Sequence, residues 1–414
     1  MTLFPVALLL LLVFTNRYFG GLFWKRLRGE RFDAVAEGYE PTVTVVVPLF
    51  NEGEGIYHTI ISLLSQDYPA SKLCVTVVDD CSTDDSYTWA CSAAASNPGR
   101  VTVLRNPHNM GKRRGINHAV REATSEIIVS VDSDVVVDPQ AVRRLVARFV
   151  RDEIVAVGGR VNVSNPNENW LTRMQAIKYY FGYEYLKNLE RSFSTVMCLS
   201  GCLTAYRRHV LVELEPILAD RNILGVPIKY GEDRFLTRQI VKAGYQTTLT
   251  LDAVCWTVAP NTVAKYFSQQ LRWRRSNLVD FFCGLSHAWR LHPVVAIHYL
   301  SLFAMLLAYP PAMVEMLAAG SFFQLATIHL GVLALFGVVY WRGAQDLPAA
   351  ARVHPLWLMP MAVVMPVTYL IYTPLALFTL DSSSWETRGK PAPAGAPVAG
   401  AEDAEAIMKG VSLS

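Results

Sequence analysis

The chain has 414 residues, of which 52% are hydrophobic and 18% are charged, and its formal net charge is +3. The length accommodates one sizeable domain with additional elements, and the hydrophobic share is too high for a protein that is soluble throughout. The small net charge gives no indication of nucleic-acid binding. Seven cysteines are scattered without a CxxC pair, which is typical of reduced thiols and not of a disulfide framework or a zinc site.

The amino-terminal region is apolar over Leu3–Phe14 and Tyr18–Trp24, with Arg17 between the two runs. No Lys or Arg precedes these runs, so a cleaved signal peptide is disfavoured and an uncleaved membrane anchor is predicted over residues 1–24. A basic cluster follows, and the positive-inside rule then places the next segment in the cytosol and the amino end outside. The cluster consists of Lys25, Arg26, Arg28 and Arg31.

Residues 40–258 are predicted to form a cytosolic α/β domain, because strand-like and helix-like segments alternate along them. Val43–Val47 is a continuous β-branched run, which is typical of a strand buried on both faces of a parallel sheet. The alternation predicts a right-handed, doubly wound, mostly parallel sheet. Strands are expected at 43–47, 73–78, 101–104 and 127–131, and helices at 56–66, 86–95 and 115–123.

Acidic pairs follow the second and the fourth of these strands, as Asp79 with Asp80 and as Asp132 with Asp134. Ligands of doubly wound sheets gather at the carboxyl ends of strands. A tight turn there can point Asp132 and Asp134 toward a hard divalent cation that keeps positions open for phosphate oxygens. An isolated acidic pair more often caps a turn or a helix. Its recurrence at two strand ends favours a ligand site.

Gln269, Arg272 and Trp273 are predicted to lie on one helix just before the strongly apolar region. Residues spaced i, i+3 and i+4 share a helix face, so this face would present an amide, a guanidinium and an indole together. The alternative is an aromatic belt at the membrane interface with a snorkelling arginine, which the nearby Trp289 fits. The predicted interface segment covers residues 259–292.

Residues 293–380 are predicted to contain three membrane-spanning helices, each near or above the roughly 20 residues that cross a bilayer. Prolines are expected to kink or break the first and the third, either as ordinary kinks or as the lining of a passage. The tail, residues 381–414, is rich in Pro, Ala and Gly and is expected to be disordered. The three candidate spans are 294–316, 322–341 and 356–380.

Seven short signatures occur in a fixed order along the chain. They are Val47-Pro48-Leu49-Phe50-Asn51-Glu52, Val77-Val78-Asp79-Asp80-Cys81-Ser82-Thr83-Asp84, Gly111-Lys112-Arg113-Arg114, Asp132-Ser133-Asp134, Cys198-Leu199-Ser200-Gly201, Gly231-Glu232-Asp233-Arg234 and Gln269-Gln270-Leu271-Arg272-Trp273. Together they resemble the family-2 glycosyltransferases of GT-A fold. Within that family the resemblance is to the processive membrane synthases of hyaluronan, chitin, chitin oligosaccharides and cellulose, and it covers about residues 40–290.

The resemblance implies catalytic roles for Glu232, Asp233 and Arg272 in an inverting transfer. Asp233 would deprotonate the acceptor hydroxyl, and Arg272 would neutralise the departing diphosphate. A carboxylate at a helix start, here a helix expected over 235–241, can instead serve only to stabilise the helix dipole.

The resemblance also implies a cofactor, Mg²⁺ or Mn²⁺, held on the diphosphate by Asp132 and Asp134. Asp80, with Asp79, would hold the uridine. The basic pair in the Gly-containing turn would approach the phosphates or the uridine, although such a pair is often only a solvated turn. The implied nucleotide-sugar-binding set is Asp79, Asp80, Lys112, Arg114, Asp132, Gln269 and Arg272.

The acceptor sugar would stack on Trp273 and lie near the loop formed by Ser200, Gly201 and Cys202. The chain departs from the family at Cys81, which stands where Gly is common, so this turn must accept a side chain. Cys202 replaces a Pro or small residue.

The tail segment Ser384-Trp385-Glu386-Thr387-Arg388 resembles a cytosolic signature of hyaluronan synthases in which Gly stands at the position of Glu386. A cytosolic tail conflicts with an outside amino end followed by four spans. One Pro-rich stretch is therefore expected to be interfacial or re-entrant.

These features predict a processive β-glycan synthase of the cell membrane, with its catalytic domain in the cytosol. Its donors would be UDP-N-acetylglucosamine and, for hyaluronan, UDP-glucuronate; its partners would be the nascent polysaccharide and the lipid bilayer, without nucleic acid. Three alternatives stay open: a chitin-type synthase that uses UDP-N-acetylglucosamine alone, a non-processive transferase acting on a lipid carrier such as polyprenyl phosphate, and a catalytically silent sugar-nucleotide sensor or partner subunit.

Overall fold

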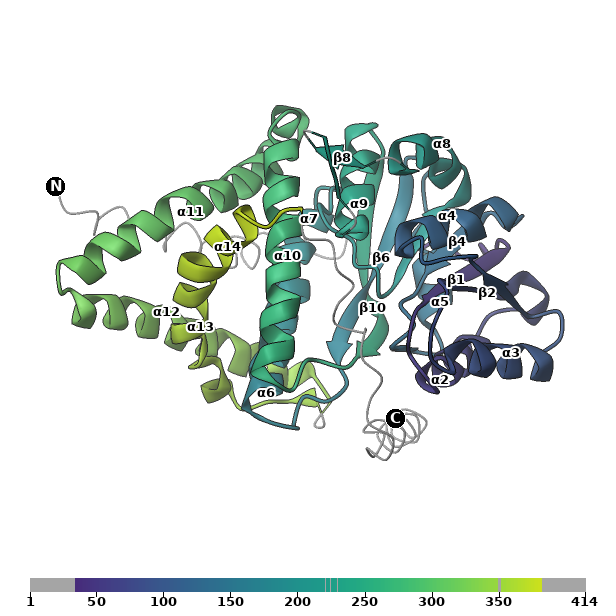
Figure 1. The fold of residues 1–414 in the computed structure, drawn as a ribbon, viewed down its shortest axis with the longest axis horizontal. Coiled ribbons are helices and arrows are strands. Elements are labelled where there is room, and N and C mark those ends of the chain that lie inside the picture. Colours follow the sequence, from purple (N-terminus) through teal and green to yellow (C-terminus); the bar gives the residue numbers. More distant parts are fainter. Residues whose placement is uncertain (1–33, 220, 224, 229, 349–350, 382–414) are drawn as a thin grey trace. The chain divides into compact units, whose positions relative to one another are not determined.

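The computed structural model describes residues 34–219, 221–223, 225–228, 230–348 and 351–381. The predicted anchor over residues 1–24 and the tail segment Ser384–Arg388 lie outside these residues. The described chain forms two compact units (Figure 1). The sheet unit comprises residues 34–165 and 196–259, and the helical unit comprises residues 166–195 and 260–381.

The sheet unit contains an eight-stranded sheet in the order β3-β2-β1-β4-β7-β6-β10-β5. Its first four strands run parallel to one another, β7 runs antiparallel to both β4 and β6, and β5 runs antiparallel to β10. Strands β6 and β10 are parallel. The strands are β1 (Val43–Leu49), β2 (Leu73–Asp79), β3 (Val101–Arg105), β4 (Ile127–Ser130), β5 (Val135–Val137), β6 (Ile154–Val163), β7 (Thr204–Arg207) and β10 (Gln246–Thr257).

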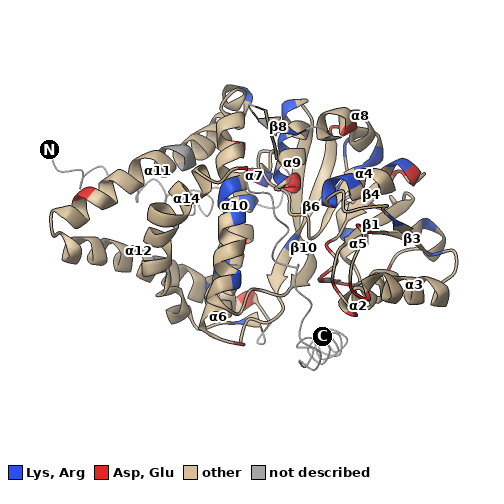
Figure 2. Ribbon diagram, in the orientation of Figure 1, with Lys and Arg blue, Asp and Glu red and all other residues tan. Residues whose placement is uncertain are grey.

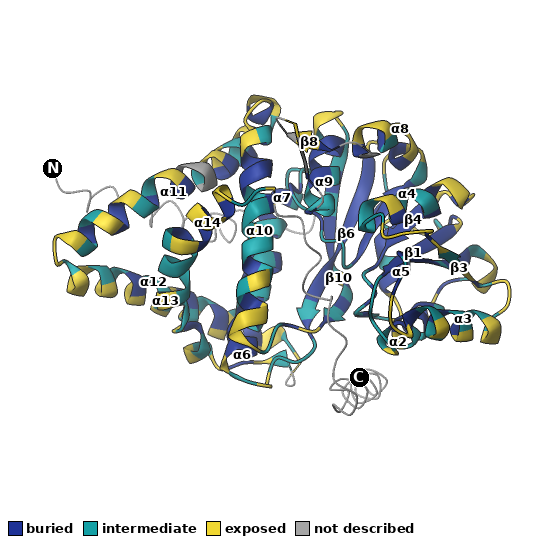
Figure 3. Cartoon of the chain, viewed as in Figure 1, coloured by how far each residue is buried: buried dark blue, intermediate teal, exposed yellow. Residues whose placement is uncertain are grey.

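The predicted strands and helices of the first part of the domain are all present, with ends shifted by a few residues. Every residue of β1 is buried (Figure 3), as expected for a β-branched strand inside a sheet. Helix α4 begins at Lys112, earlier than predicted, so this lysine lies in the first turn of a helix. The helices that follow the first three strands are α2 (Gly55–Leu64), α3 (Ser86–Ser96) and α4 (Lys112–Glu122).

The second part of the sheet unit carries the helices that complete the site. Helix α9 (Glu232–Lys242) starts after Gly231, whose φ of +66° lies in the left-handed region that favours glycine. The remaining elements are α5 (Ala141–Val146), α8 (Arg208–Ala219) and the antiparallel pair β8 (Asn222–Ile223) and β9 (Val226–Pro227).

In the helical unit, α6 (Trp170–Phe181) begins with a capping box formed by Asn169 and Thr172. It packs on α10 (Val263–Gly284) through a small buried cluster of Leu171, Met174 and Tyr266. Helix α6 continues into the π-helical η3 (Gly182–Lys187) and then α7 (Asn188–Arg191). The short 3₁₀ helix η4 (Ala288–Arg290) follows α10. Because residues 166–195 group with α10, a single domain over 40–258 stays a prediction.

Three helical stretches among the described residues are long and apolar enough to cross a membrane: Pro293–Ala318, Phe322–Asp346 and Pro355–Leu377. Figure 2 shows few charged residues on α11 and α12. Helix α11 continues through Pro310-Pro311, whereas the third stretch is divided into short pieces around its prolines. The first stretch is α11 (Pro293–Ala318), and the second consists of α12 (Phe322–Gly343) and η5 (Ala344–Asp346). The third consists of η7 (Pro355–Leu358), α13 (Met361–Val367), η8 (Thr368–Tyr372) and α14 (Thr373–Leu377).

Candidate functional site

Asp79 closes strand β2 and is fully buried. Its carboxylate accepts a hydrogen bond from the Ser82 backbone N–H at 3.1 Å and forms an ion pair with Arg105 Nε at 3.0 Å. Arg105 ends the neighbouring strand β3, so the two strand ends are tied together. Direct contact between Asp79 and a uridine stays a prediction.

Asp80 organises the turn that leads into α4. Its carboxylate accepts hydrogen bonds from Asn106 Nδ2 and the Met110 backbone N–H, both at 2.8 Å, and from the Gly111 backbone N–H at 2.7 Å. A carboxylate offers about four acceptor positions, so these bonds use most of them. Cys81 follows with a φ of +64°, and the turn therefore does accept a side chain in the left-handed region.

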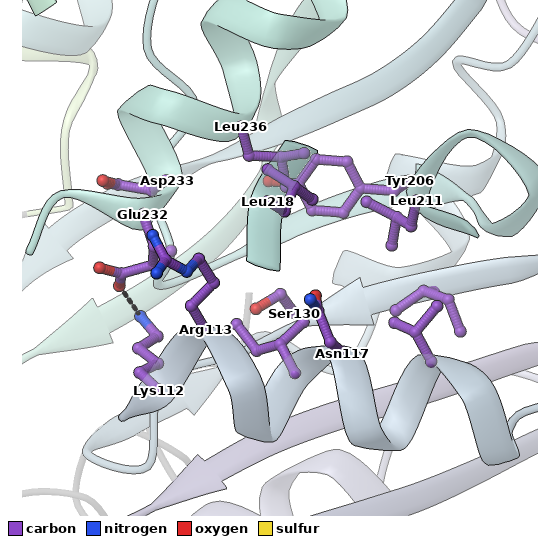
Figure 4. A pocket seen from close by; sticks show the side chains of 14 residues that line it. Lys112, Arg113, Asn117, Ser130, Tyr206, Leu211, Leu218, Glu232, Asp233 and Leu236 are labelled. Carbon is purple, nitrogen blue, oxygen red and sulfur yellow. Dashed lines mark ion pairs between the residues drawn. The ribbon is translucent and has the colours of Figure 1, made fainter. Parts of the chain in front are cut away.

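Lys112 links two of the predicted acidic residues. Its Nζ lies 2.5 Å from Asp132 Oδ1 and 2.9 Å from Glu232 Oε1 (Figure 4 shows the Glu232 contact), and only 9% of its side chain is exposed. Burial alone lowers the pKa of Lys112, but the two carboxylates outweigh it and hold this pKa well above its usual value. A buried ammonium therefore lies between β4 and the start of α9.

The loop predicted to lie near the acceptor comes very close to this ammonium. A Cβ on Gly201 would lie 2.7 Å from Lys112 Nζ, so only glycine permits the observed approach. The Cys202 thiol donates to Asp132 Oδ2 at 3.4 Å, while burial and Asp132 raise the pKa of this thiol. Ser200 Oγ accepts from the Cys202 backbone N–H at 3.3 Å. The sheet unit thus brings this loop and the first Asp of the acidic pair together.

Glu232 and Asp233 occupy the first turn of α9 and have opposite electrostatic environments. Burial raises the pKa of Glu232, but Lys112 outweighs burial and lowers this pKa overall. Burial and the neighbouring Glu232 raise the pKa of Asp233, against the opposing charge of Lys112. The Arg234 backbone N–H donates to Asp233 Oδ1 at 2.8 Å. Two adjacent carboxyls with pKa values pushed apart are suited to separate roles in proton transfer.

A cavity opens beside this pair (Figure 4). Lys112, Glu232 and Asp233 lie at one end. Apolar side chains from α4, β4, α8 and α9 line most of the rest, together with the polar Arg113, Asn117 and Ser130. Tyr206 of β7 also lines it, and burial raises the pKa of its phenol. The sequence analysis did not find Tyr206, because a tyrosine within a short strand carries no motif.

The metal-binding prediction rests on Asp132 and Asp134, which flank the turn after β4. No group of three or more His, Cys, Asp or Glu side chains within the described residues is arranged to hold a metal ion. Two carboxylates are nonetheless the oxygen donors that Mg²⁺ or Mn²⁺ prefers when phosphate oxygens supply other ligands. Arg114 is exposed and does not line the cavity, and its contact with the nucleotide stays a prediction.

Gln269, Arg272 and Trp273 lie on α10 in the helical unit. Arg272 Nε is buried and has no hydrogen-bond partner among the described residues. Trp273 is 37% exposed, and its ring centroid lies 6.4 Å from that of Tyr179 on α6. Contact between the side chains of Gln269, Arg272 and Trp273 and the carboxylates of the sheet unit stays a prediction. Trp289, 74% exposed, fits the expected interfacial position.

The comparison with protein families decides the class of protein. The model described as "Glycosyltransferase like family 2" matches residues 41–276. The chain belongs to this family. The match extends from β1 through the segment Gln269–Trp273, so all seven signatures lie within it. As a family-2 glycosyltransferase the chain is an enzyme, as predicted.

Curated relatives extend the likeness beyond the matched region. An N-acetylglucosaminyltransferase of Bradyrhizobium diazoefficiens is 32% identical over 365 residues, which is 85% of this chain and 73% of that protein. One of Sinorhizobium fredii is 30% identical over 369 residues, 86% of each chain. One of Rhizobium meliloti is 35% identical over 257 residues, 62% of this chain and 60% of that protein.

A solved structure supports the fold. A mannosyltransferase of Pyrobaculum calidifontis, in complex with GDP-Man and Mn²⁺, is 24% identical and superposes with a TM-score of 0.55 over 87% of this chain and 99% of that one. At this identity the likeness concerns the fold alone. The prediction of a GT-A α/β domain with a mostly parallel sheet and additional apolar helices is confirmed.

Proposed function

We propose that this glycosyltransferase transfers N-acetylglucosamine from UDP-N-acetylglucosamine to a growing β-glycan, with inversion at the transferred carbon. The observation that carries the proposal is the contrast between two adjacent carboxyls, Asp233 with a raised pKa and Glu232 held ionised by Lys112. The curated relatives are named N-acetylglucosaminyltransferases, which supports the choice of N-acetylglucosamine.

Asp233 is the proposed general base. Inverting transfer needs a group that accepts the proton of the attacking hydroxyl, and its efficiency increases as its pKa approaches the working pH. The partly buried Asp233 has a raised pKa, borders the cavity and is fixed by the Arg234 N–H. Glu232 stays ionised beside Lys112 and therefore does not compete for that proton.

The departing diphosphate is the second requirement of the reaction. Asp132 and Asp134 would hold Mg²⁺ or Mn²⁺, which supplies charge stabilisation to phosphate oxygens. Lys112 is an ammonium already placed at Asp132, and donor phosphates would offer it a further partner. Arg272, whose Nε has no partner among the described residues, is the proposed second cation for the leaving group.

We further propose that the enzyme is processive and bound to the membrane, with its sheet unit in the cytosol. The three apolar helical stretches support membrane attachment. Chain elongation needs the product to remain bound, and an exposed indole such as Trp273 is a suitable surface for a sugar ring. Export of the product past the Pro-interrupted third stretch follows as part of the same proposal.

The second donor separates two versions of this function. The names of the curated relatives mention transfer of N-acetylglucosamine and no second sugar, which favours a chitin-type enzyme that uses UDP-N-acetylglucosamine alone. The tail segment Ser384–Arg388 favours a hyaluronan-type enzyme that also uses UDP-glucuronate.

The deciding experiment is UDP release by the detergent-purified full chain with Mg²⁺ or Mn²⁺. The donors are UDP-N-acetylglucosamine, UDP-glucuronate, both together, and UDP-glucose. Release with UDP-N-acetylglucosamine alone supports the chitin-type version, and release that needs both donors, with a hyaluronidase-sensitive product, supports the hyaluronan-type version. If no tested donor containing N-acetylglucosamine gives UDP, the proposal is wrong.

A further inference from the structure

Lys178 lies on the face of α6 that packs against α10. In this contact Leu171, Met174 and Tyr266 form the buried cluster, and Lys178 stands one turn beyond Met174. On α10, Gln270 and Trp273 lie four and seven residues beyond Tyr266, on the same face. The lysine therefore points its stem along an apolar contact toward the Gln-x-x-Arg-Trp segment.

Among the described residues, the ammonium of Lys178 contacts three side chains of α10. It donates to Gln270 Oε1 at 2.7 Å and lies 5.7 Å from the ring centroid of Tyr266 and 5.9 Å from that of Trp273. No carboxylate among the described residues pairs with it. Burial, with a smaller contribution from the charge of Arg274, lowers the pKa of Lys178 to about 8.

Lys178 is partly buried, and an ammonium without a carboxylate partner is costly to remove from water, so its contacts with α10 indicate a role beyond packing. The ammonium of Lys178 and the ring of Tyr179, both on α6, lie beside the indole of Trp273. Trp273 remains 37% exposed. The indole is thus supported by α6 while part of it stays open to a ligand.

We propose that Lys178 is a positioning residue that holds the indole of Trp273 in the orientation needed to bind the acceptor sugar. The inference rests on the proposed function, because it takes Trp273 as the acceptor platform. A side chain locked by its neighbours loses less conformational freedom when the ligand binds, and affinity for the ligand increases accordingly.

The competing explanation is a lysine that only covers apolar surface with its stem. Lys187 of η3 offers a matched control, because its Nζ lies 4.3 Å from the Tyr183 ring centroid and donates to the Tyr183 hydroxyl at 3.3 Å. It therefore has a similar lysine–tyrosine contact in the same unit, but within the described part of the chain it forms no hydrogen bond or cation–π contact with α10.

The test uses the full chain in detergent and two reactions. UDP release from UDP-N-acetylglucosamine without added acceptor reports donor binding and hydrolysis, and transfer to a β-linked N-acetylglucosamine oligosaccharide reports acceptor use. Lys178→Met is expected to raise the KM for the oligosaccharide about tenfold, while the KM for the donor and acceptor-independent UDP release stay at wild-type values. Lys178→Arg should restore most of the acceptor affinity, and Lys187→Met should change neither reaction.

A double-mutant comparison separates positioning from general stability. In a Trp273→Ala background, Lys178→Met should cause little further increase in the acceptor KM. Gln270→Ala removes the hydrogen-bond acceptor of Lys178, should weaken acceptor binding in the same way, and carries the test if Lys178→Met does not fold. An unchanged acceptor KM in a folded Lys178→Met or Gln270→Ala variant would overturn the inference, as would fully additive effects with Trp273→Ala. Absence of UDP release from the wild type would instead count against the proposed function.

Discussion

Asp233 owes its proposed role to its environment. Its carboxyl is disfavoured in the ionised form by burial and by the charge of Glu232, and its pKa is therefore raised. The same aspartate in an exposed turn would have a pKa of about 3.9 and would be a weaker base at neutral pH. The adjacent Glu232, held by Lys112, shows how one ion pair separates two neighbouring carboxyls.

Asp233→Asn should abolish sugar transfer while UDP binding stays largely intact, because the amide cannot accept the proton. In the wild type, kcat should decrease as pH falls through the raised pKa of Asp233, at a higher pH than for an ordinary aspartate.

A raised pKa of Asp233 in the folded state means that the stability of the protein decreases as pH rises between the usual and the raised value. The Asp233→Asn variant, whose amide is neutral at every pH, should therefore be at least as stable as the wild type at pH 7, which thermal unfolding at several pH values will check. Polymer synthesis retained by this variant would contradict the assignment.

Gly201 permits the close approach of the acceptor loop to Lys112. A methyl group in Gly201→Ala would lie 2.7 Å from Lys112 Nζ, so the flexible end of the lysine should move away from Asp132. We expect transfer to fall by about tenfold or more, which corresponds to about 1.4 kcal/mol or more in the barrier, with little change in the melting temperature. Gly55→Ala is the control, since a Cβ at Gly55 meets nothing within 4 Å. Equal rates for the two variants would argue against a role for this approach.

Helix α10 carries the signature Gln269–Trp273 and also packs against apolar neighbours. Its first part packs on α6 through Tyr266. In its later part, Arg275 donates hydrogen bonds to Thr379, just beyond the last apolar stretch. Both contacts fix the rotation of the helix about its axis. That rotation determines which way Arg272 and Trp273 face.

Arg272→Ala should lose elongation, because it removes a guanidinium proposed to neutralise the departing diphosphate. Kinetic measurement should show a decrease in kcat of at least about a hundredfold, in the range found when one transition-state donor is removed. Lys265→Ala changes an exposed cation in the first turn of the same helix and should have no comparable effect. Product chains of wild-type length from Arg272→Ala would refute the leaving-group role.

At the scale of the whole molecule, the chain combines an α/β unit rich in charged groups with a unit of apolar helices. In the most apolar part of Phe322–Asp346, only 11% is buried against other described residues. A surface so apolar and so little covered is typical of a lipid-facing helix. This supports the proposed attachment to a bilayer.

Alkaline carbonate washing of membranes should therefore leave the chain in the pellet, and only detergent should release it. Immunoblotting of the two fractions measures this outcome, with a peripheral membrane protein as the control that washes off. Recovery of the chain in the carbonate supernatant would show that the apolar stretches do not span the bilayer.

The sequence by itself determined the class of this protein and the order of its first elements. A β-branched run such as Val43–Val47 indicates a buried strand from local pattern alone, and acidic pairs placed after strands indicate where a ligand site lies. Apolar length is likewise a local property, so the three stretches long enough to cross a membrane were predictable. The signatures up to Trp273 identified the family because their order is a property of the sequence.

Only the tertiary structure decided how these groups act on one another. The pairing of Lys112 with Asp132 and Glu232 joins residues far apart in the chain, and no local pattern encodes it. The insertion of β7 antiparallel between β4 and β6 likewise depends on long-range strand pairing. The contact of Lys178 with α10 was invisible in sequence, because burial and pKa follow from neighbours that only folding supplies.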